Sequence, residues 1–321
     1  MKSGVALGYN PTDFFKTRAV VEPLSADPTV LREDRLGTLM VRGQHIGEGG
    51  SLTAAFAPRV SSASAIYTNT NLPSLDPMFD RTNAQNRLLL KSSVDTAGGL
   101  SPEVLLYRQG SQTLFGANLT ASVNQNVVAY LEWAGGRRAS LIDDALRFGR
   151  NTGTLPPNAP SALPENSHRS FQNELSVGAS YTTETKITFN LEYHLNQAAF
   201  SRTDWNHWFA TGRDASASSP VARELWFIRS YALDQQQQLS RHVLFLRADW
   251  SDAFIPRLEL MGFVNTDLYD GSSLVQLSAD YHVSNAWTVG AIFFSNFGGR
   301  HSDFGSLPQV ASFLVKVARY F

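Results

Sequence analysis

Between residues 186 and 196 the chain alternates apolar and polar side chains without a break. Ile187, Phe189, Leu191, Tyr193 and Leu195 alternate with Lys186, Thr188, Asn190, Glu192, His194 and Asn196. Successive side chains of a β-strand point to opposite faces, so this pattern gives one apolar and one polar face. A helix, with 3.6 residues per turn, would mix the two sets. The segment therefore predicts a strand between an apolar medium and water.

Similar segments of about ten residues recur along the chain, separated by turn residues. We expect about fourteen strands, at 3–9, 36–46, 51–58, 86–94, 102–109, 112–123, 126–135, 171–182, 186–199, 240–250, 256–269, 272–283, 286–297 and 309–321. Many strands of this length with one apolar face are typical of an all-β transmembrane antiparallel up-and-down β-barrel.

Composition narrows the alternatives. No run reaches the roughly 18 to 20 apolar residues of a spanning helix. The 27 basic and 28 acidic residues nearly cancel and form no basic stripe, so nucleic acid is not an expected partner. The absence of cysteine is compatible with an oxidising compartment. The first nine residues lack a signal-peptide core, so the sequence is expected to be a mature form or a truncated one whose upstream strands are missing.

The lengths of the connections give an independent test, because outer-membrane barrels have short periplasmic turns and long outer loops. If the C-terminus is periplasmic, the inner turns are 284–285, 251–255, 183–185, 124–125, 95–101 and 47–50. The outer connections are 10–35, 59–85, 136–170, 201–239 and 298–308, with tight exceptions at 110–111 and 270–271. Every long loop thus falls on one side.

Residues 222 to 233 could form a further strand, which would reverse that assignment. A helix within the outer loop is preferred, because Ser219 is a good N-cap and Pro220 suits the first turn.

Aromatic residues lie at the ends of the expected strands, on the apolar face. Such residues form girdles at membrane interfaces because the ring is apolar and its edge tolerates water. The periplasmic girdle would comprise Tyr181, Trp250, Tyr281, Trp287 and Phe321, and the outer girdle Trp133 and Phe297. The competing explanation is that aromatic residues are simply common in strands.

The polar faces carry charges of both signs. The expected pore-lining residues are Arg42, Arg87, Lys91, Glu132, Glu174, Lys186, Glu192, His194, Arg247, Asp249, Arg257, Glu259, Asp267, Asp280, His282 and Lys316. A dry core could not hold so many ionisable groups, since an unpaired buried charge costs several kcal/mol. The interior is therefore expected to be wet or densely ion-paired, with little preference for anions or cations.

Two hairpins allow a prediction of register. A two-residue turn at 270–271 would place Asn265 opposite Gln276 and Glu259 opposite His282. The turn at 183–185 would place Glu174 opposite His194. In both ladders polar residues then face polar ones.

The acidic and histidine residues of the polar faces can be interpreted as catalytic, as metal-binding or as structural. Glu174, Glu192 and His194 could form an acid–base group, or a metal site together with Asp280 and His282. Hydrogen bonding along the lumen wall explains these residues better, because no nucleophile with its base lies beside them. Asp204 and His207, near Trp205 and Trp208, form a second cluster, for which packing within an aromatic-rich loop is preferred. We expect no enzyme, metal or cofactor.

Two stretches carry a family resemblance. Residues 298–308 leading into Arg319-Tyr320-Phe321 resemble the closing hairpin of large bacterial outer-membrane porins, including alginate-export-type barrels. Residues 8–15, Gly-Tyr-Asn-Pro-Thr-Asp-Phe-Phe, resemble a loop start in the same group. The resemblance implies a passive or substrate-guiding channel without chemistry. Arg319 departs from it, because that position is often aromatic; a cation there would reach the headgroup level.

The sequence thus predicts a single domain, 1–321, in the Gram-negative outer membrane, forming a channel for small hydrophilic solutes or saccharides. Its expected partners are outer-membrane lipid, those solutes, and the barrel-assembly machinery through the strand ending at Phe321. One alternative is a barrel that only scaffolds an enzymatic or adhesive outer surface. Another is a soluble all-β binding protein with a dry core.

Overall fold

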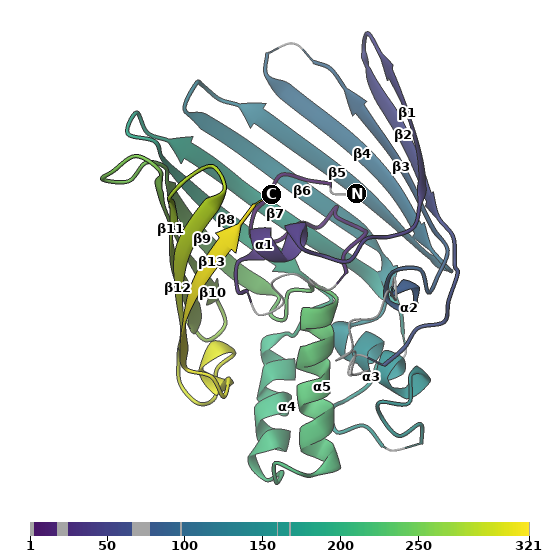
Figure 1. Cartoon of the computed structure of the whole chain (residues 1–321). Helices are drawn as coiled ribbons and strands as arrows, with labels where there is room; N and C mark the ends of the chain where they lie inside the picture. The colour runs from purple at the N-terminus through teal and green to yellow at the C-terminus, as the bar shows by residue number, and fades with distance from the viewer. Residues whose placement is uncertain are drawn as a thin grey trace.

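The computed structural model describes residues 3–17, 25–65, 78–96, 98–158, 160–166 and 168–320. Its main element is one curved antiparallel sheet in which each strand pairs with its neighbours along the chain (Figure 1). The strands are β1 (Val41–Gly47), β2 (Gly50–Ala57), β3 (Arg87–Val94), β4 (Leu100–Gln109), β5 (Gln112–Ser122), β6 (Val127–Arg138), β7 (Ser170–Thr182), β8 (Ile187–Asn196), β9 (His242–Trp250), β10 (Leu258–Asp267), β11 (Ser273–His282), β12 (Trp287–Phe297) and β13 (Ala311–Arg319). The predicted all-β, up-and-down antiparallel fold is confirmed.

The two faces of the sheet differ in chemistry. We call the face that residues 3–17 contact the inner face, and the opposite one the outer face. On β8, Phe189 and Leu191 are 43% and 52% exposed on the outer face, whereas Asn190 and Glu192 are buried on the inner face. Outward leucine, valine and phenylalanine side chains recur from β2 to β13. The sorting of apolar from ionisable side chains follows the alternation in the sequence.

The two ends of the sheet also differ. At one end, the short-turn end, the strands are joined by residues 48–49, 95–99, 123–126, 183–186, 251–257 and 283–286. At the other, the long-connection end, they are joined by residues 58–86, 110–111, 139–169, 197–241, 268–272 and 298–310. Every long connection lies at one end, as the sequence predicted.

The long connections carry most of the helices. A layer of α3 (Leu141–Asn151), α4 (Arg202–Arg213) and α5 (Pro220–Asp234) lies beyond the sheet at the long-connection end (Figure 1). Ser219 caps α5 and Pro220 occupies its first turn, so the predicted helix is confirmed. The helices α3 and α4 were not predicted from the sequence; they begin at the N-caps Ser140 and Ser201. The layer has its own apolar core, which includes Leu146, Trp205 and Ile228. None of the helices in the described part of the chain is long and apolar enough to span a bilayer.

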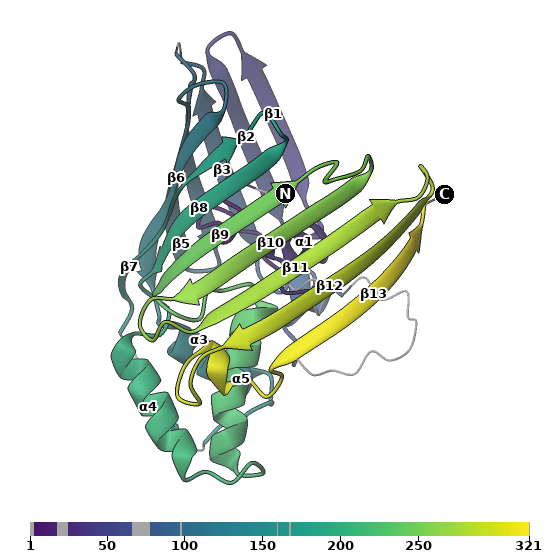
Figure 2. The same ribbon diagram turned by 90° about the vertical axis from the view of Figure 1, so that its left-hand side faces the viewer.

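The remaining helical elements are short: α1 (Pro28–Glu33), α2 (Phe79–Thr82) and the 3-10 turn η1 (Phe304–Ser306). In both views α1 lies in the concavity of the sheet (Figures 1 and 2).

Two predictions for the N-terminal part of the chain were wrong. Residues 3–9 form no strand, so the described sheet has thirteen strands instead of about fourteen. These residues, with 10–17 and α1, lie inside the concavity, although 10–35 was expected in an outer loop. The sheet is also open among the described residues, because β1 and β13 each pair with only one neighbour (Figure 2).

The predicted registers were wrong by two residues. Asn265 lies opposite Leu274, Glu259 opposite Asp280, and Glu174 opposite Asn196. The β10–β11 connection comprises residues 268–272, longer than the expected two-residue turn, and this lengthening shifts every later pair. A shift of two positions keeps each side chain on its face, so the face assignments survive the error.

Candidate functional site

Residues 3–17 form an extended segment that runs across the inner face of the sheet, and we call it the strap (Figure 1). Its backbone has no strand partner. It is held instead by side chains that project from the sheet.

Two buried glutamates bind successive backbone amides of the strap. Glu132 on β6 accepts hydrogen bonds from Val5 and Ala6, the latter at 2.7 Å. Glu192 on β8 accepts hydrogen bonds from Leu7 at 2.7 Å and Gly8 at 2.9 Å. Charge-assisted hydrogen bonds to backbone amides are among the stronger ones in proteins. Two carboxylates therefore satisfy four consecutive donors.

The carboxylates are themselves held in place. Glu192 also accepts hydrogen bonds from the Tyr130 hydroxyl and lies 2.7 Å from His194 Nε2. Thr12 bridges Asn118 at 2.8 Å and Glu132 at 3.2 Å. The contact forms one buried polar network.

Glycine is required at two strap positions. A Cβ on Gly4 would lie 2.2 Å from Glu132 Oε2, and Gly4 has a φ of 81°. A Cβ on Gly8 would lie 2.5 Å from His194 and 2.7 Å from Phe245. The strap can approach the sheet this closely only because both residues lack a side chain.

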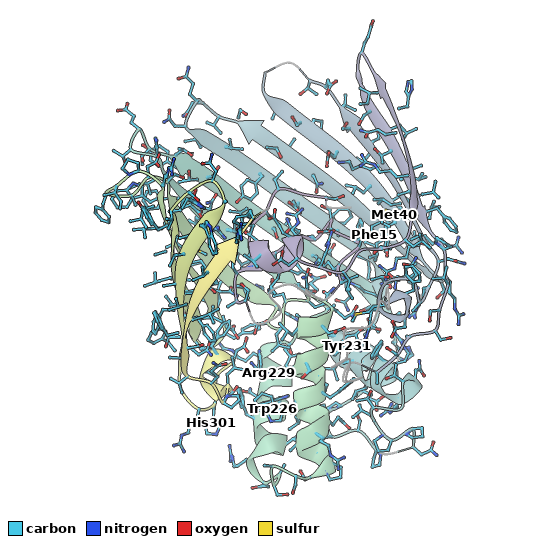
Figure 3. The ribbon with its side chains drawn as sticks, viewed as in Figure 1. Phe15, Met40, Trp226, Arg229, Tyr231 and His301 are labelled. Atoms are coloured by element: carbon cyan, nitrogen blue, oxygen red, sulfur yellow. The ribbon has the colours of Figure 1, made fainter. Side chains whose placement is uncertain are left out.

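The other end of the strap docks on an apolar part of the inner face. Phe14 stacks on Tyr107 at a ring distance of 4.8 Å, and Phe15 meets the same ring edge-on at 5.7 Å. Phe15 is buried with Leu89 and Leu105, near Met40 (Figure 3). The inner face is therefore not polar throughout.

Arginines tie the strap to α1 and to the sheet. Arg32 on α1 donates to Asp13 at 3.2 Å and to the Ser3 carbonyl at 2.6 Å. Arg247 on β9 donates at 2.9 Å to Asp27, the N-cap of α1. The strap and α1 thus form one unit bound to the wall.

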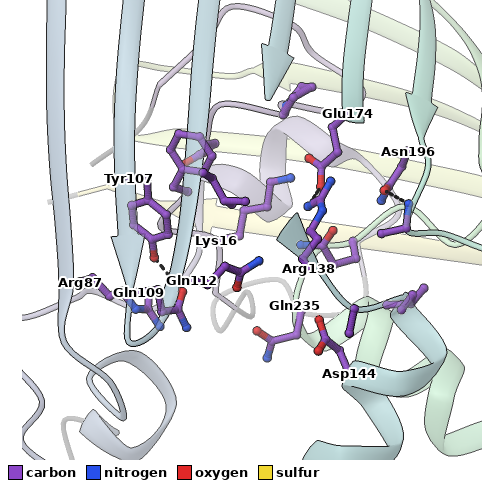
Figure 4. A pocket seen from close by; sticks show the side chains of 18 of the residues that line it. Lys16, Arg87, Tyr107, Gln109, Gln112, Arg138, Asp144, Glu174, Asn196 and Gln235 are labelled. Atoms are coloured by element: carbon purple, nitrogen blue, oxygen red, sulfur yellow. Dashed lines mark hydrogen bonds and ion pairs between the residues drawn. The ribbon is translucent and has the colours of Figure 1, made fainter. Parts of the chain in front are cut away.

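A charged cavity of about 170 Å³ lies between the strap, α3 and the strands (Figure 4). Arg138 and Glu174 form an ion pair at its side, and Lys16 of the strap points toward them. Asp144 and Gln235 contribute further polar groups from α3 and the end of α5. The lining therefore carries groups of both signs of charge.

The structure places the sixteen predicted pore-lining residues in four settings. Arg87, Glu132, Glu174, Glu192, His194 and Asp267 are buried. Lys91, Arg247, Asp249, Asp280, His282 and Lys316 are partly buried on their strands, while Arg42 and Glu259 are exposed on theirs. Lys186 and Arg257 lie in short turns rather than on strands, and Lys186 pairs with Asp252 at 2.6 Å.

The predicted girdle residues lie near strand ends. Tyr181, Trp250, Tyr281 and Trp287 are at the short-turn end, and Trp133 and Phe297 nearer the long-connection end. Tyr181, Tyr281, Trp287 and Phe297 are exposed. Phe321 lies outside the described residues.

The geometry does not support the hypotheses of a catalytic group or a metal site. His194 contacts Glu192, but Glu192 binds the amides of the strap, and Glu174 pairs with Arg138 instead. Within the described ranges, no group of three His, Asp or Glu side chains could hold a metal ion. Asp204 caps α4 through a capping box with Ser201, and His207 on the same helix is exposed. The cluster around Trp205 is therefore helix packing.

The strap itself was missed by the sequence analysis. Its apolar residues partly alternate, which suggested a strand. The useful signal was the pair of glycines four residues apart followed by Asn10 and Pro11, which disfavours a regular strand.

The fold and site define an antiparallel up-and-down sheet with an apolar outer face and an inner face that carries the buried ionisable groups and holds a segment of its own chain. No family model and no curated protein matches the chain, so the alginate-export-type resemblance has no support there. Among solved structures, the chain is similar to OccK10 (OpdN) of Pseudomonas aeruginosa, with a TM-score of 0.49, 11% identity, and coverage of 97% of this chain and 77% of that one. It is also similar to OccK8 (OprE) of the same organism, with a TM-score of 0.47, 11% identity, and coverage of 85% and 67%.

Proposed function

We propose that the chain forms the wall of a channel in the Gram-negative outer membrane, through which small hydrophilic solutes or saccharides pass. The observation that carries the proposal is the sorting of side chains over thirteen strands: exposed large apolar residues lie on the outer face, and the buried ionisable residues of the strands lie on the inner face. Apolar surface of this extent is costly in water, at about 25 cal/mol per Å², and favourable in hydrocarbon.

The solute path in this proposal runs along the inner face, past the strap. The charged cavity beside Lys16, Arg138 and Glu174 supplies hydrogen-bonding groups of both signs, which suits polar solutes and gives weak ion selectivity. The strap narrows this path, because it crosses the inner face and is fixed at Glu132 and Glu192.

Planar-bilayer conductance tests the proposal. The purified full chain should give stepwise currents with a reversal potential near zero in a salt gradient. Replacing both strap-binding glutamates, Glu132→Gln with Glu192→Gln, should raise the unit conductance, whereas Glu259→Gln should leave it unchanged. Absence of any current, or strong selectivity for one sign of charge, would contradict the proposal.

A second candidate is a membrane-embedded scaffold that displays its outer surface. The separate apolar core of the α3–α5 layer, with Trp205 and Trp208 buried in it, favours this candidate, because it shows that the layer is built as a unit. A scaffold would insert into bilayers and carry no current.

A further inference from the structure

A second cavity, of about 440 Å³, lies between the strap, α1, α5 and strands β9 to β11. It is separate in character from the charged cavity, because most of its lining is apolar. Its walls include Leu7, Leu31, Trp226, Leu239, Val243 and Leu274. Sites for small molecules are commonly apolar cavities of about 300 to 1,000 Å³ with a few polar groups.

Two of the cations around this cavity are already ion-paired. Arg229 pairs with Asp303 at 2.8 Å, and Arg32 pairs with Asp13 at 3.2 Å. Lys16 lies 3.9 Å above the ring of Tyr9. A charged occupant would lose its hydration against a lining that is mostly apolar, so the cavity favours a neutral molecule.

Two buried acceptors at the cavity have no partner. Asn265 Oδ1 on β10 and Gln238 Oε1, beyond the end of α5, are buried and accept no hydrogen bond. Leaving a buried acceptor unsatisfied costs about 1–3 kcal/mol. Rotation of either side chain toward the cavity would let an O–H or N–H donor of a bound molecule recover part of that cost.

From these observations we propose that the cavity binds a small neutral aromatic molecule carrying a hydrogen-bond donor, such as a phenol-like solute. The rings of Tyr9, Trp226 and Phe304 at the cavity favour an aromatic body, because offset and edge-on ring contacts add to simple burial. The inference refines the proposed function and rests on it for the solute's route, whereas binding itself is measurable without any current.

The test is equilibrium binding of 2-naphthol to the full chain in detergent at pH 7, followed by naphthol fluorescence. Naphthalene is the matched probe without the hydroxyl group. We expect one saturable site per chain and about five- to tenfold tighter binding of 2-naphthol, the effect of one hydrogen bond. Linear, unsaturable uptake of both probes would show that they only partition into detergent and would overturn the proposal.

Neighbouring residues on opposite faces give matched variants. Leu274→Trp fills the cavity and should weaken 2-naphthol binding at least tenfold, while Val275→Trp, on the outer face, should not change it. Asn265→Leu should reduce 2-naphthol binding to the level of naphthalene, with Thr266→Val on the outer face as its control. Equal binding within either pair would contradict the site. If Leu274→Trp does not fold, as judged by loss of the folded band on an unheated gel, the second pair decides.

The two proposals fail separately. Naphthol binding without conductance would remove the channel and keep the site; conductance without naphthol binding would remove the site alone.

Discussion

The inner face under the strap and the inner face beyond it carry similar side chains in different surroundings. On β6 and β8, Glu132 and Glu192 are fully buried and bind backbone amides of the strap. On β10 to β13, Glu259 lies 3.5 Å from His282 and Asp280 lies 3.4 Å from Lys316, and the side chain of Glu259 is 59% exposed. Glu132 and Glu192 thus act as binding groups because the strap offers them unpaired amide donors, whereas Glu259 and Asp280 lie beside a cationic partner on the wall.

The largest difference between the two regions is expected on removing the carboxylates. Replacing Glu132 and Glu192 together by Ala deprives four strap amides of partners, each charge-assisted bond being worth about 1.5–3 kcal/mol. Since the chain has no cysteine, Leu7→Cys provides a single labelling position in the strap. The double variant should raise its rate of reaction with a maleimide at least tenfold.

Glu259→Ala in the same Leu7→Cys background is the control, and it should leave the labelling rate unchanged. An unchanged rate in the double variant would mean that the glutamates do not hold the strap.

At the long-connection end, a carboxyl group is buried by connecting segments instead of by the strap. Asp303, near η1, bonds to Arg229 of α5, and burial raises the pKa of its carboxyl from 3.8 to about 6. Between these pKa values the folded chain keeps a proton on Asp303 that the unfolded chain releases. Protonated Asp303 therefore raises the free energy of unfolding by its full amount below about pH 4, and this contribution is lost as the pH rises to about 6. The contribution of this pKa shift to the free energy of unfolding is at most about 3 kcal/mol, because one pKa unit corresponds to about 1.36 kcal/mol.

Guanidinium unfolding followed by tryptophan fluorescence at pH 4, 5, 6 and 7 would measure this dependence. Asp303→Asn should flatten the curve between pH 4 and 6. If the free energy of unfolding varied with pH in the same way in the wild type and in Asp303→Asn, groups other than Asp303 would be responsible.

Close approach of the strap predicts a smaller effect. Gly8→Ala would place a methyl group 2.5 Å from His194, and such overpacking typically costs about 1–3 kcal/mol. The Leu7→Cys labelling rate should rise severalfold. Gly43→Ala on β1, where a Cβ meets nothing within 4 Å, should not alter the labelling rate. Equal rates in the two variants would show that the contact between Gly8 and the sheet can accommodate a methyl group.

The smallest effect is expected beyond the strap. Lys316→Met removes the partner of Asp280, and partly exposed ion pairs contribute about 0–1 kcal/mol. The free energy of unfolding in guanidinium should change by less than about 1 kcal/mol. A loss of several kcal/mol would show that this wall is as tightly coupled as the region under the strap.

Much of the sheet could be predicted from the sequence because alternation and turn residues are local signals. All thirteen observed strands overlap expected segments, and the helix at Pro220–Asp234 follows from its cap and first-turn proline. Register was less predictable, because it depends on the length of each connection and the β10–β11 connection is longer than two residues. Because side chains alternate with a period of two, a register shifted by two residues still places every side chain on the face that was predicted.

The site could not be predicted to the same extent, because it joins residues far apart in the chain. The charge on Glu192 was identified, but its partners are amides at positions 7 and 8, and backbone groups carry no sequence signal. Phe14 and Phe15 also dock on inner-face leucines of β3 and β4. A rule that places every apolar side chain outward fails there.

Spin labelling along β8 offers the clearest check on the orientation of the sheet. Phe189→Cys, Asn190→Cys and Leu191→Cys, each labelled in lipid vesicles, sample consecutive positions on alternating faces. Labels at 189 and 191 should be relaxed strongly by oxygen dissolved in the hydrocarbon and weakly by a water-soluble nickel chelate, while the label at 190 should not show this preference. Oxygen accessibility without alternation, or highest at 190, would contradict a wall whose apolar face meets lipid.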